Sequence, residues 1–255
     1  MQTMNKTTPL ILVTKDEGVY APGIQAVFAA LHEVGRVVMV APERDNSAVS
    51  HSLTMARPLK IKQLAESVHT LDGTPADCVI LALEKVLDRR PDLLVSGINQ
   101  GGNLCEDISY SGTVSAAIEG TMLGVPSMAL SMPGEAPLFF ETAAAVAVKI
   151  ARKILLCGLP KDTLLNINVP NVPEMNGLKV VFTRQGKRLY SDVVKETADP
   201  WGRKHYWIGG GRPSWDADDG TDSKEVQSGH ISITPIHLDL TNYEALEFLR
   251  GSWKD

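Results

Sequence analysis

Short apolar runs alternate with helical patterns over the first two thirds of the chain. The runs that predict strands are Leu10–Val13, Val37–Val40, Val68–Leu71, Leu93–Val95, Pro126–Ser131 and Leu164–Val169, with Leu59–Ile61 as a further extended piece. The segments with apolar residues at helical spacing are Ile24–Val34, Pro75–Leu87, Val114–Leu123 and Phe140–Leu156. This alternation is typical of an α/β fold whose mainly parallel sheet is covered by helices on both faces.

The pattern changes after about residue 180. The predicted elements there are strands over Val180–Thr183, Asp192–Glu196 and Ile231–Ile233 and a helix over Tyr243–Leu249. Between them, the segment Trp201–Gly211 gathers aromatic, basic and glycine residues, which is typical of a twisted hairpin. An isolated hairpin cannot bury the large side chains of Trp201, Tyr206 and Trp207. Exposed aromatic side chains usually mark an interface, so we predict that residues 185–230 form an arm that reaches a partner subunit.

The end of the first predicted strand carries two adjacent acids. Asp16 and Glu17 follow Leu10–Val13 and precede Gly18. The carboxyl end of the first strand of an α/β protein is where such folds bind ligands, and paired carboxylates suit a hard divalent cation. A polar turn whose acids face water explains this segment equally well when it is taken alone.

Two other strand ends have the same form. A turn rich in Gly follows Leu93–Val95 and contains Asn99 and Asn103, whose amides can bind a metal ion or a phosphate. A loop dense in hydroxyl and amide groups, Glu43–Ser52, follows Val37–Val40. The three polar loops can therefore converge on one crevice.

A helix start follows shortly after the second of these turns. Ser111, Gly112 and Thr113 precede a run of helix formers. The free N–H groups and the positive dipole end of a helix bind phosphate well. Simple N-capping also explains the two hydroxyl residues, and it is compatible with phosphate binding.

Taken together, these segments resemble the stationary-phase survival protein (SurE) family of metal-dependent nucleotidases. The matching pieces, in family order, are Thr14–Gly23, Ala41–Ser52, Gly73–Cys78, Val95–Asn103, Tyr110–Gly120, Leu165–Pro170 and Thr221–Pro235. The resemblance implies one three-layer, Rossmann-like α/β domain over residues 1–255. It also implies hydrolysis of nucleoside 5'-monophosphates, with 3'-nucleotides and polyphosphate as further candidate substrates. The arm over residues 185–230 would be exchanged between the subunits of a homodimer or homotetramer.

The resemblance also assigns the site residues. One Mg²⁺ or Mn²⁺ per subunit would be held by Asp16, Glu17, Ser47 and Asn99, of which Asp16, Glu17 and Asn99 also count as catalytic. The residues expected to bind substrate are Lys15, Asn46, Asn103, Ser111, Gly112 and Thr113. We expect a water molecule to attack phosphorus, with nucleophilic attack by Asp16 as the alternative.

The chain departs from the family pattern at the centre of this site. The family usually has Asn-Asp-Asp-Gly where this chain has Lys15, Asp16, Glu17 and Gly18. The lysine could repel the metal ion, turn outward, or clamp the substrate phosphate. These two substitutions are the only support for a second hypothesis, that the chain is a nucleotide- or phosphate-binding regulator with impaired turnover.

The composition of the chain bears on its partners and its location. A net charge of −5 from 25 basic and 30 acidic residues, with no dense basic run, argues against a nucleic-acid surface. Cys78, Cys105 and Cys157 form no CxxC pair, so we expect buried reduced thiols. The polar start, Met1–Thr8, lacks the apolar core of a signal peptide, and no apolar run approaches the length of a membrane span. We therefore expect a cytoplasmic protein.

Other motifs are absent or open to two interpretations. The sequence has no GxxxxGK[ST] phosphate loop and no GxGxxG after the first strand, which argues against a kinase and against a dinucleotide-dependent oxidoreductase. It also has no GxSxG motif, which argues against a serine hydrolase. His51 could be an acid–base group or simply part of a polar loop. The acidic segment over residues 214–223 has the spacing of a calcium loop but lacks its twelfth-position Glu, so calcium is not favoured.

Overall fold

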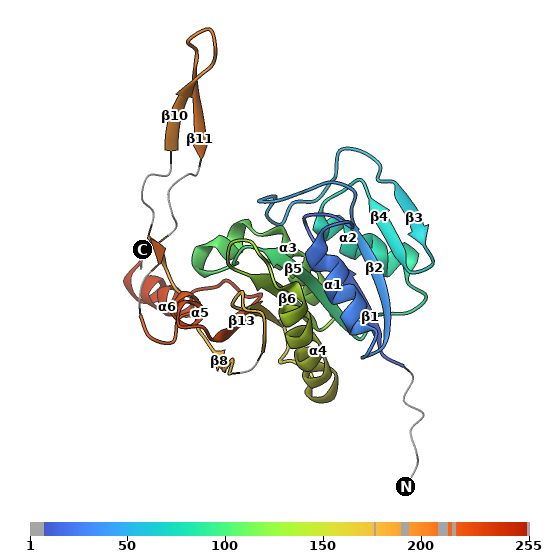
Figure 1. Ribbon diagram of the computed structural model, residues 1–255. Helices are drawn as coiled ribbons and strands as arrows, with labels where there is room; N and C mark the ends of the chain where they lie inside the picture. The colour runs from blue at the N-terminus through green and yellow to red at the C-terminus, as the bar shows by residue number, and fades with distance from the viewer. Residues whose placement is uncertain (1–7, 176, 190–193, 209–213, 216–217, 254–255) are drawn as a thin grey trace.

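A large, mainly parallel sheet runs through the molecule (Figure 1). The computed structural model describes residues 8–175, 177–189, 194–208, 214–215 and 218–253. The strands of the sheet are β1 Leu10–Thr14, β2 Arg36–Pro42, β3 Ile61–Ala65, β4 Val68–Leu71, β5 Leu93–Gln100, β6 Ser127–Met132, β7 Thr163–Asn168, β8 Val180–Phe182 and β13 Ile231–His237. Within the described residues their order is β3-β4-β2-β1-β5-β6-β7-β13-β8. The pairs β3–β4 and β7–β13 are antiparallel and the others are parallel.

Helices cover both faces of this sheet. The helical segments are α1 Pro22–Leu31, α2 Pro75–Leu81, the π-helical turn η1 Ala82–Val86, the 3₁₀ segment η2 Cys105–Tyr110, α3 Gly112–Met122, α4 Phe140–Cys157, α5 Asp222–Gln227 and α6 Tyr243–Ser252. Helices α1 and α4 pack on one face, and α2 and α3 on the other (Figure 1). The three-layer α/β prediction is therefore confirmed. None of the described helices has the length and apolar character that a bilayer span requires.

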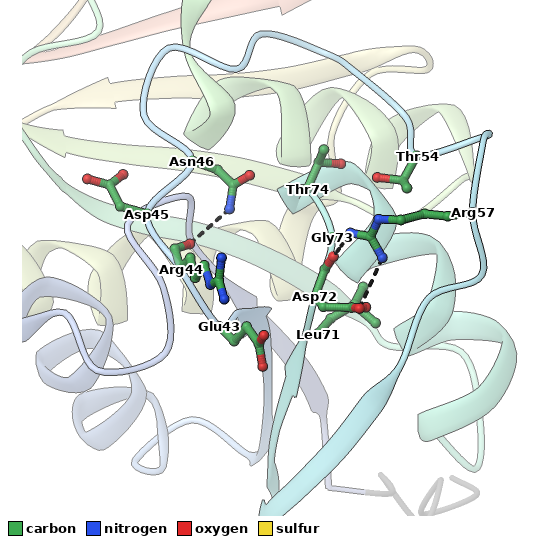
Figure 2. A pocket seen from close by; sticks show the side chains of 10 residues that line it. All are labelled: Glu43, Arg44, Asp45, Asn46, Thr54, Arg57, Leu71, Asp72, Gly73 and Thr74. Atoms are coloured by element: carbon green, nitrogen blue, oxygen red, sulfur yellow. Dashed lines mark hydrogen bonds and ion pairs between the residues drawn. The ribbon is translucent and has the colours of Figure 1, made fainter.

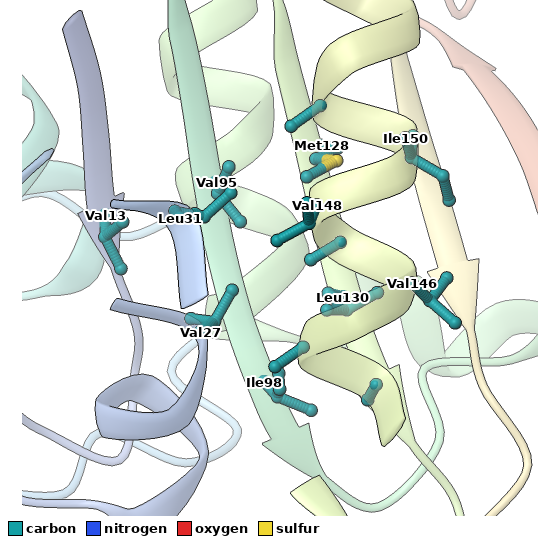
Figure 3. Packing of buried hydrophobic residues seen from close by; sticks show 14 of the residues in the cluster. Val13, Val27, Leu31, Val95, Ile98, Met128, Leu130, Val146, Val148 and Ile150 are labelled. Atoms are coloured by element: carbon teal, nitrogen blue, oxygen red, sulfur yellow. The ribbon is translucent and has the colours of Figure 1, made fainter. Parts of the chain in front are cut away.

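Both faces of β1 are buried, which explains its unbroken apolar run. Ile11 and Val13 pack in the cluster that contains α1 and α4, which Figure 3 shows from close by. Leu10 and Leu12 point to the opposite face and pack with α2 and α3. A strand covered on both sides must be apolar at every position rather than at alternate ones.

The parallel register brings the polar strand ends to one edge of the sheet. Val13 of β1 pairs with Met39 of β2 and with Val95 of β5. The segments that follow these three strands therefore emerge together, as the sequence predicted.

Some boundaries differ from the predicted ones. The glycine-rich turn predicted after Val95 is wrong, because β5 continues to Gln100 by pairing with β6, where Asn99 lies opposite Ser131. The register shifts between Gly97 and Asn99. The third strand also begins later than Leu59.

The predicted hairpin is present. Strands β10 Val194–Ala198 and β11 Lys204–Ile208 form an antiparallel pair that stands away from the body (Figure 1). At its root, β9 Arg188–Leu189 pairs with β12 Ser214–Trp215. Asp192, Asp216 and residues 209–211 lie outside the described residues. The exchange of this arm between subunits stays a prediction.

The prediction of buried thiols is correct for two of the cysteines. Cys78 and Cys105 are buried, whereas Cys157 is exposed because it is the last residue of α4.

Candidate active site

A cavity of about 510 Å³ opens at the carboxyl edge of the sheet. Its lining residues are Asp16, Glu17, Ser47, Ala48, Asn99, Gln100, Gly102, Asn103, Asp107, Tyr110, Ser111, Arg188 and Ile208. All four residues predicted to bind metal line this cavity, as do Asn103 and Ser111 from the predicted substrate set. The loops after β1 and β2 and the end of β5 thus converge as expected.

Asp16 lies directly against the start of α3. The carboxylate is only 4% exposed, and Thr113 Oγ1 donates a hydrogen bond of 2.7 Å to its Oδ1. A Cβ added to Gly112 would lie 2.8 Å from the Asp16 Cβ, so only glycine permits this close approach. Burial raises the pKa of Asp16, while the Thr113 hydrogen bond and the charge of Lys15 oppose this rise.

Lys15 lies beneath the cavity with its side chain fully buried. Its Nζ forms an ion pair with Glu17 Oε2, and Glu17 Oε1 accepts a hydrogen bond of 3.3 Å from the Gln100 N–H. The outward orientation considered for Lys15 is therefore wrong. Burial lowers the pKa of this ammonium group, and the contact with Glu17 opposes the shift.

The loop after β2 is fixed to the end of β1. The Asn46 N–H donates to the Asp16 carbonyl at 2.9 Å. The Ser47 N–H and hydroxyl both donate to Asp45 Oδ1, at 2.8 and 2.6 Å. In this contact the Ser47 hydroxyl is the donor, and among the described residues it accepts no hydrogen bond, so its lone pairs can face a cation. The Asn46 side chain lines a neighbouring cavity of about 380 Å³ instead (Figure 2).

The two asparagines of the β5 segment have different surroundings. Asn99 Nδ2 donates to the Gly101 carbonyl at 3.0 Å, which fixes the amide plane. Asn103 is held in a buried amide network. Its side-chain Nδ2 donates to Ser131 Oγ at 2.7 Å, and its backbone carbonyl accepts from the side-chain Nδ2 atoms of Asn166 and Asn168. The phosphate contact expected of Asn103 stays a prediction.

Sequence reasoning missed Asn166 and Asn168 as supports of the site. They alternate along β7, so they point to the same face of the sheet. Polar residues at alternate positions of a buried strand are the signal that could have identified them.

The donor atoms around Asp16 fit a hard divalent cation. Two carboxylates, a hydroxyl and an amide oxygen from Asp16, Glu17, Ser47 and Asn99 line one cavity, and such oxygen sets suit Mg²⁺ and Mn²⁺. In the part of the chain that the structure describes, no three His, Cys, Asp or Glu side chains gather into a metal-binding group. The acids that line this cavity are Asp16, Glu17 and Asp107, and Asp107 pairs with Arg188.

Comparison with known proteins identifies the family. The family model described as "Survival protein SurE" matches residues 11–192. The chain belongs to the SurE family. It is 50% identical over 242 residues to "5'-nucleotidase SurE" of Syntrophotalea carbinolica, covering 94% of this chain and 96% of that protein. It is 48% identical to the protein of that name from Aquifex aeolicus, covering 95% and 97%.

A solved structure agrees with this assignment. The crystal structure of a SurE protein from Aquifex aeolicus superposes with a TM-score of 0.85 at 45% identity, covering 96% of this chain and all of that chain. The resemblance inferred from the sequence motifs is confirmed, and so is the Rossmann-like fold that it implied.

Two further contacts join segments around the cavity. His51 Nε2 lies 2.7 Å from Glu119 Oε2 on α3, and this contact joins the loop after β2 to the phosphate-binding helix candidate. Arg188 from the arm root forms an ion pair with Asp107 at the cavity wall. A direct chemical role for His51 stays a hypothesis.

Proposed function

We propose that this chain is a divalent-metal-dependent phosphomonoesterase that hydrolyses nucleoside 5'-monophosphates to nucleosides and phosphate. The observation that carries the proposal is the contact of Asp16 with the start of α3. It supports phosphate binding beside an acid, because Asp16 and Ser111, the N-cap of α3, both line the cavity and Asp16 contacts the first turn of the helix. The name 5'-nucleotidase on relatives that match nearly the whole chain supports the same reaction.

Asp16, Glu17, Ser47 and Asn99 would hold Mg²⁺ or Mn²⁺ in this site. When bound, the cation would supply positive charge against the developing charge of the phosphoryl group. A bound cation would compete with the Lys15 ammonium group for the carboxylate of Glu17. In this chain, Lys15 therefore partly neutralises the residue that matches the family's second acid.

The chain's own groups bind and orient the substrate. In the first turn of α3, no carbonyl of the helix can accept from the N–H groups of Gly112 and Thr113, whereas the Val114 N–H donates to Ser111 Oγ. The N–H groups of Gly112 and Thr113 would bind the non-bridging phosphate oxygens next to Ser111 and Thr113, where the helix dipole favours negative charge. Thr113 holds Asp16 in place at 2.7 Å.

A water molecule then attacks phosphorus and the nucleoside 5'-oxygen leaves with a proton. Attack by Asp16 itself, with a phospho-aspartyl intermediate, is the alternative route. The configuration at phosphorus separates them, because a single in-line attack by water inverts it, whereas two successive displacements through phospho-Asp16 retain it.

The direct test is phosphate release from AMP with Mg²⁺ or Mn²⁺ present. We expect the wild type to turn over and Asp16→Ala to lose both activity and metal binding by calorimetry. Asp218→Asn, which removes an exposed acid that pairs with Arg184, is the matched control and should behave as wild type. Nucleotide binding without turnover by the wild type would contradict the proposal and favour a regulator. Unchanged metal binding in Asp16→Ala would contradict the ligand set.

The finer assignments also remain proposals. A homodimer or homotetramer in the cytoplasm is supported by the arm and by the three thiols without a CxxC pair. Screening 3'-nucleotides and polyphosphate beside AMP defines the substrate range.

A further inference from the structure

The active-site cavity extends well beyond the atoms that would hold phosphate and metal. Tyr110 and Ile208 line the same cavity as Asp16, and both are exposed, Tyr110 to 57%. They come from different segments, since Tyr110 ends η2 and Ile208 ends β11 of the arm. An aromatic and an aliphatic side chain thus add apolar surface to a cavity whose other end is acidic and polar.

Hydrogen bonds fix this wall of the cavity. The Tyr110 carbonyl accepts from the Ser50 N–H at 3.1 Å. On the other side, Gln185 Nε2 donates to the Cys105 carbonyl at 2.9 Å, and Arg188 forms an ion pair with Asp107. These contacts join the root of the arm to η2 and hold the backbone of Tyr110 in place, so the tyrosine side of the wall is positioned before a ligand binds.

The position of Tyr110 relative to α3 sets what can reach it. Tyr110 immediately precedes Ser111, whose hydroxyl caps α3 by accepting from the Val114 N–H at 3.1 Å. A group esterified to a phosphate at this helix start can therefore reach Tyr110, because Tyr110 and Ser111 are adjacent and line the same cavity. The cavity volume of about 510 Å³ lies in the range of small-molecule sites.

We propose that Tyr110 and Ile208 form the nucleobase subsite of this cavity, with the base stacked on the Tyr110 ring. The inference rests on the proposed nucleotidase function and adds to it the contact that distinguishes a nucleotide from other phosphomonoesters. Every base has a π face, so stacking on one ring tolerates purines and pyrimidines alike. We therefore expect rates for the common nucleoside monophosphates to differ by less than about tenfold, with purines favoured by their larger area.

The neighbouring cavity is the competing place for the base. It lies across the loop after β2, and its lining is mostly charged and polar. The lining residues are Glu43, Arg44, Asp45, Asn46, Thr54, Arg57, Leu71, Asp72, Gly73 and Thr74. Within this cavity, Figure 2 shows the ion pair between Arg57 and Asp72. Bases stack best on rings and apolar surface, which the Tyr110 wall offers.

The experiment measures inhibition of AMP hydrolysis by the two halves of the substrate, adenosine and inorganic phosphate. Tyr110→Ala should raise the inhibition constant of adenosine about tenfold and leave that of phosphate unchanged. Tyr110→Phe keeps the ring and should retain wild-type values for both. Ile208→Ser should raise the adenosine constant by a smaller factor, about threefold. Tyr20→Ala, which removes an exposed tyrosine outside the cavity lining, is the matched control and should change neither.

The outcomes separate this subsite from the proposed function. If the wild type does not hydrolyse AMP, the function itself fails. If AMP is hydrolysed but Tyr110→Ala leaves the adenosine constant unchanged, or raises both constants equally, the subsite is overturned. An adenosine constant that rises in Arg44→Ala rather than in Tyr110→Ala would overturn it too and place the base in the neighbouring cavity.

Discussion

At the scale of single residues, Lys15 controls how much negative charge the site offers to a cation. Its side chain is fully buried and its ammonium group pairs with Glu17, so a metal ion must compete with it for that carboxylate. We predict that Lys15→Asn tightens Mn²⁺ binding about tenfold or more, because a like charge is removed from the metal's neighbourhood. Activity at limiting Mn²⁺ should rise in parallel. Calorimetry and steady-state kinetics across a manganese titration measure both.

Lys15→Met is the matched control for this prediction, since it approximates the length of the lysine side chain and removes the ammonium group. The two variants should act alike if charge is the cause. A higher KM for AMP with unchanged metal dependence would instead assign Lys15 to the substrate phosphate. In the absence of metal, both Lys15 variants should also unfold at a lower temperature than the wild type. The reason is that Asp16 and Glu17 then lose the ammonium group that offsets the repulsion between their charges.

Gly112 sets the distance between α3 and Asp16. An alanine Cβ at this position would lie 2.8 Å from the Asp16 Cβ, so either the helix start or the carboxylate must move. We predict that Gly112→Ala lowers kcat about tenfold or more, because small displacements of catalytic groups are costly. Its cost in the free energy of unfolding should be about 1–3 kcal/mol.

Gly251→Ala serves as the control, since nothing lies within 4 Å of a Cβ at that position of α6. It should leave kcat unchanged and alter stability by no more than about 1 kcal/mol, in the stabilising direction that helix propensity favours. Urea unfolding beside steady-state kinetics makes the comparison. Equal kcat values for Gly112→Ala and wild type would show that the contact with Asp16 is not needed.

At the scale of elements, Asp222 at the start of α5 joins three segments. Its buried carboxylate accepts from the N–H groups of Cys105, Gly186 and Ser223 at 2.8 to 2.9 Å. We predict that Asp222→Asn destabilises the fold by about 1–3 kcal/mol, because an amide NH₂ would face a buried donor and leave it unsatisfied. Asp218→Asn, at an exposed ion pair, should cost little.

Hydrogen exchange distinguishes this tie from a general loss of stability. The Cys105 and Gly186 N–H groups should exchange faster in Asp222→Asn than amides of β1, whose exchange follows global unfolding. A uniform change across the chain would contradict the local role.

Much of the element order was predictable because periodicity reports burial directly. The run Leu10–Val13 is apolar throughout since β1 is covered on both faces, and Asp16 follows it at the edge where ligands bind. The extension of β5 to Gln100 was not predictable, because pairing with β6 overrides the turn preference of its Gly and Asn residues. The buried ion pair of Lys15 with Glu17 was also not predictable, because the sequence does not show which way the side chain of a lysine next to two acids points.

At the scale of the whole molecule, the hairpin of β10 and β11 cannot bury its own side chains. Trp201 and Trp207 are exposed, and two isolated strands are marginally stable in water. We predict that the chain forms a homodimer or larger through this arm and that Trp201→Ser with Trp207→Ser weakens association. Sedimentation at micromolar concentration measures it. Tyr20→Ser, at an exposed aromatic residue outside the arm, should leave the assembly intact, and a monomeric wild type would refute the prediction.

The two roots of the arm leave and rejoin the body side by side. The Arg184 N–H donates to the Gly220 carbonyl at 3.0 Å, and the Asp222 N–H donates to the Arg184 carbonyl at 2.9 Å. The chain therefore leaves the body at Arg184 and rejoins it next to that residue, at Gly220 and Asp222. Insertions or deletions in this part of the gene can change its length without shifting the pairing of β8 with β13. If the arm sets the assembly, as predicted above, the number of subunits can change in this way while Asp16 and α3 stay in place.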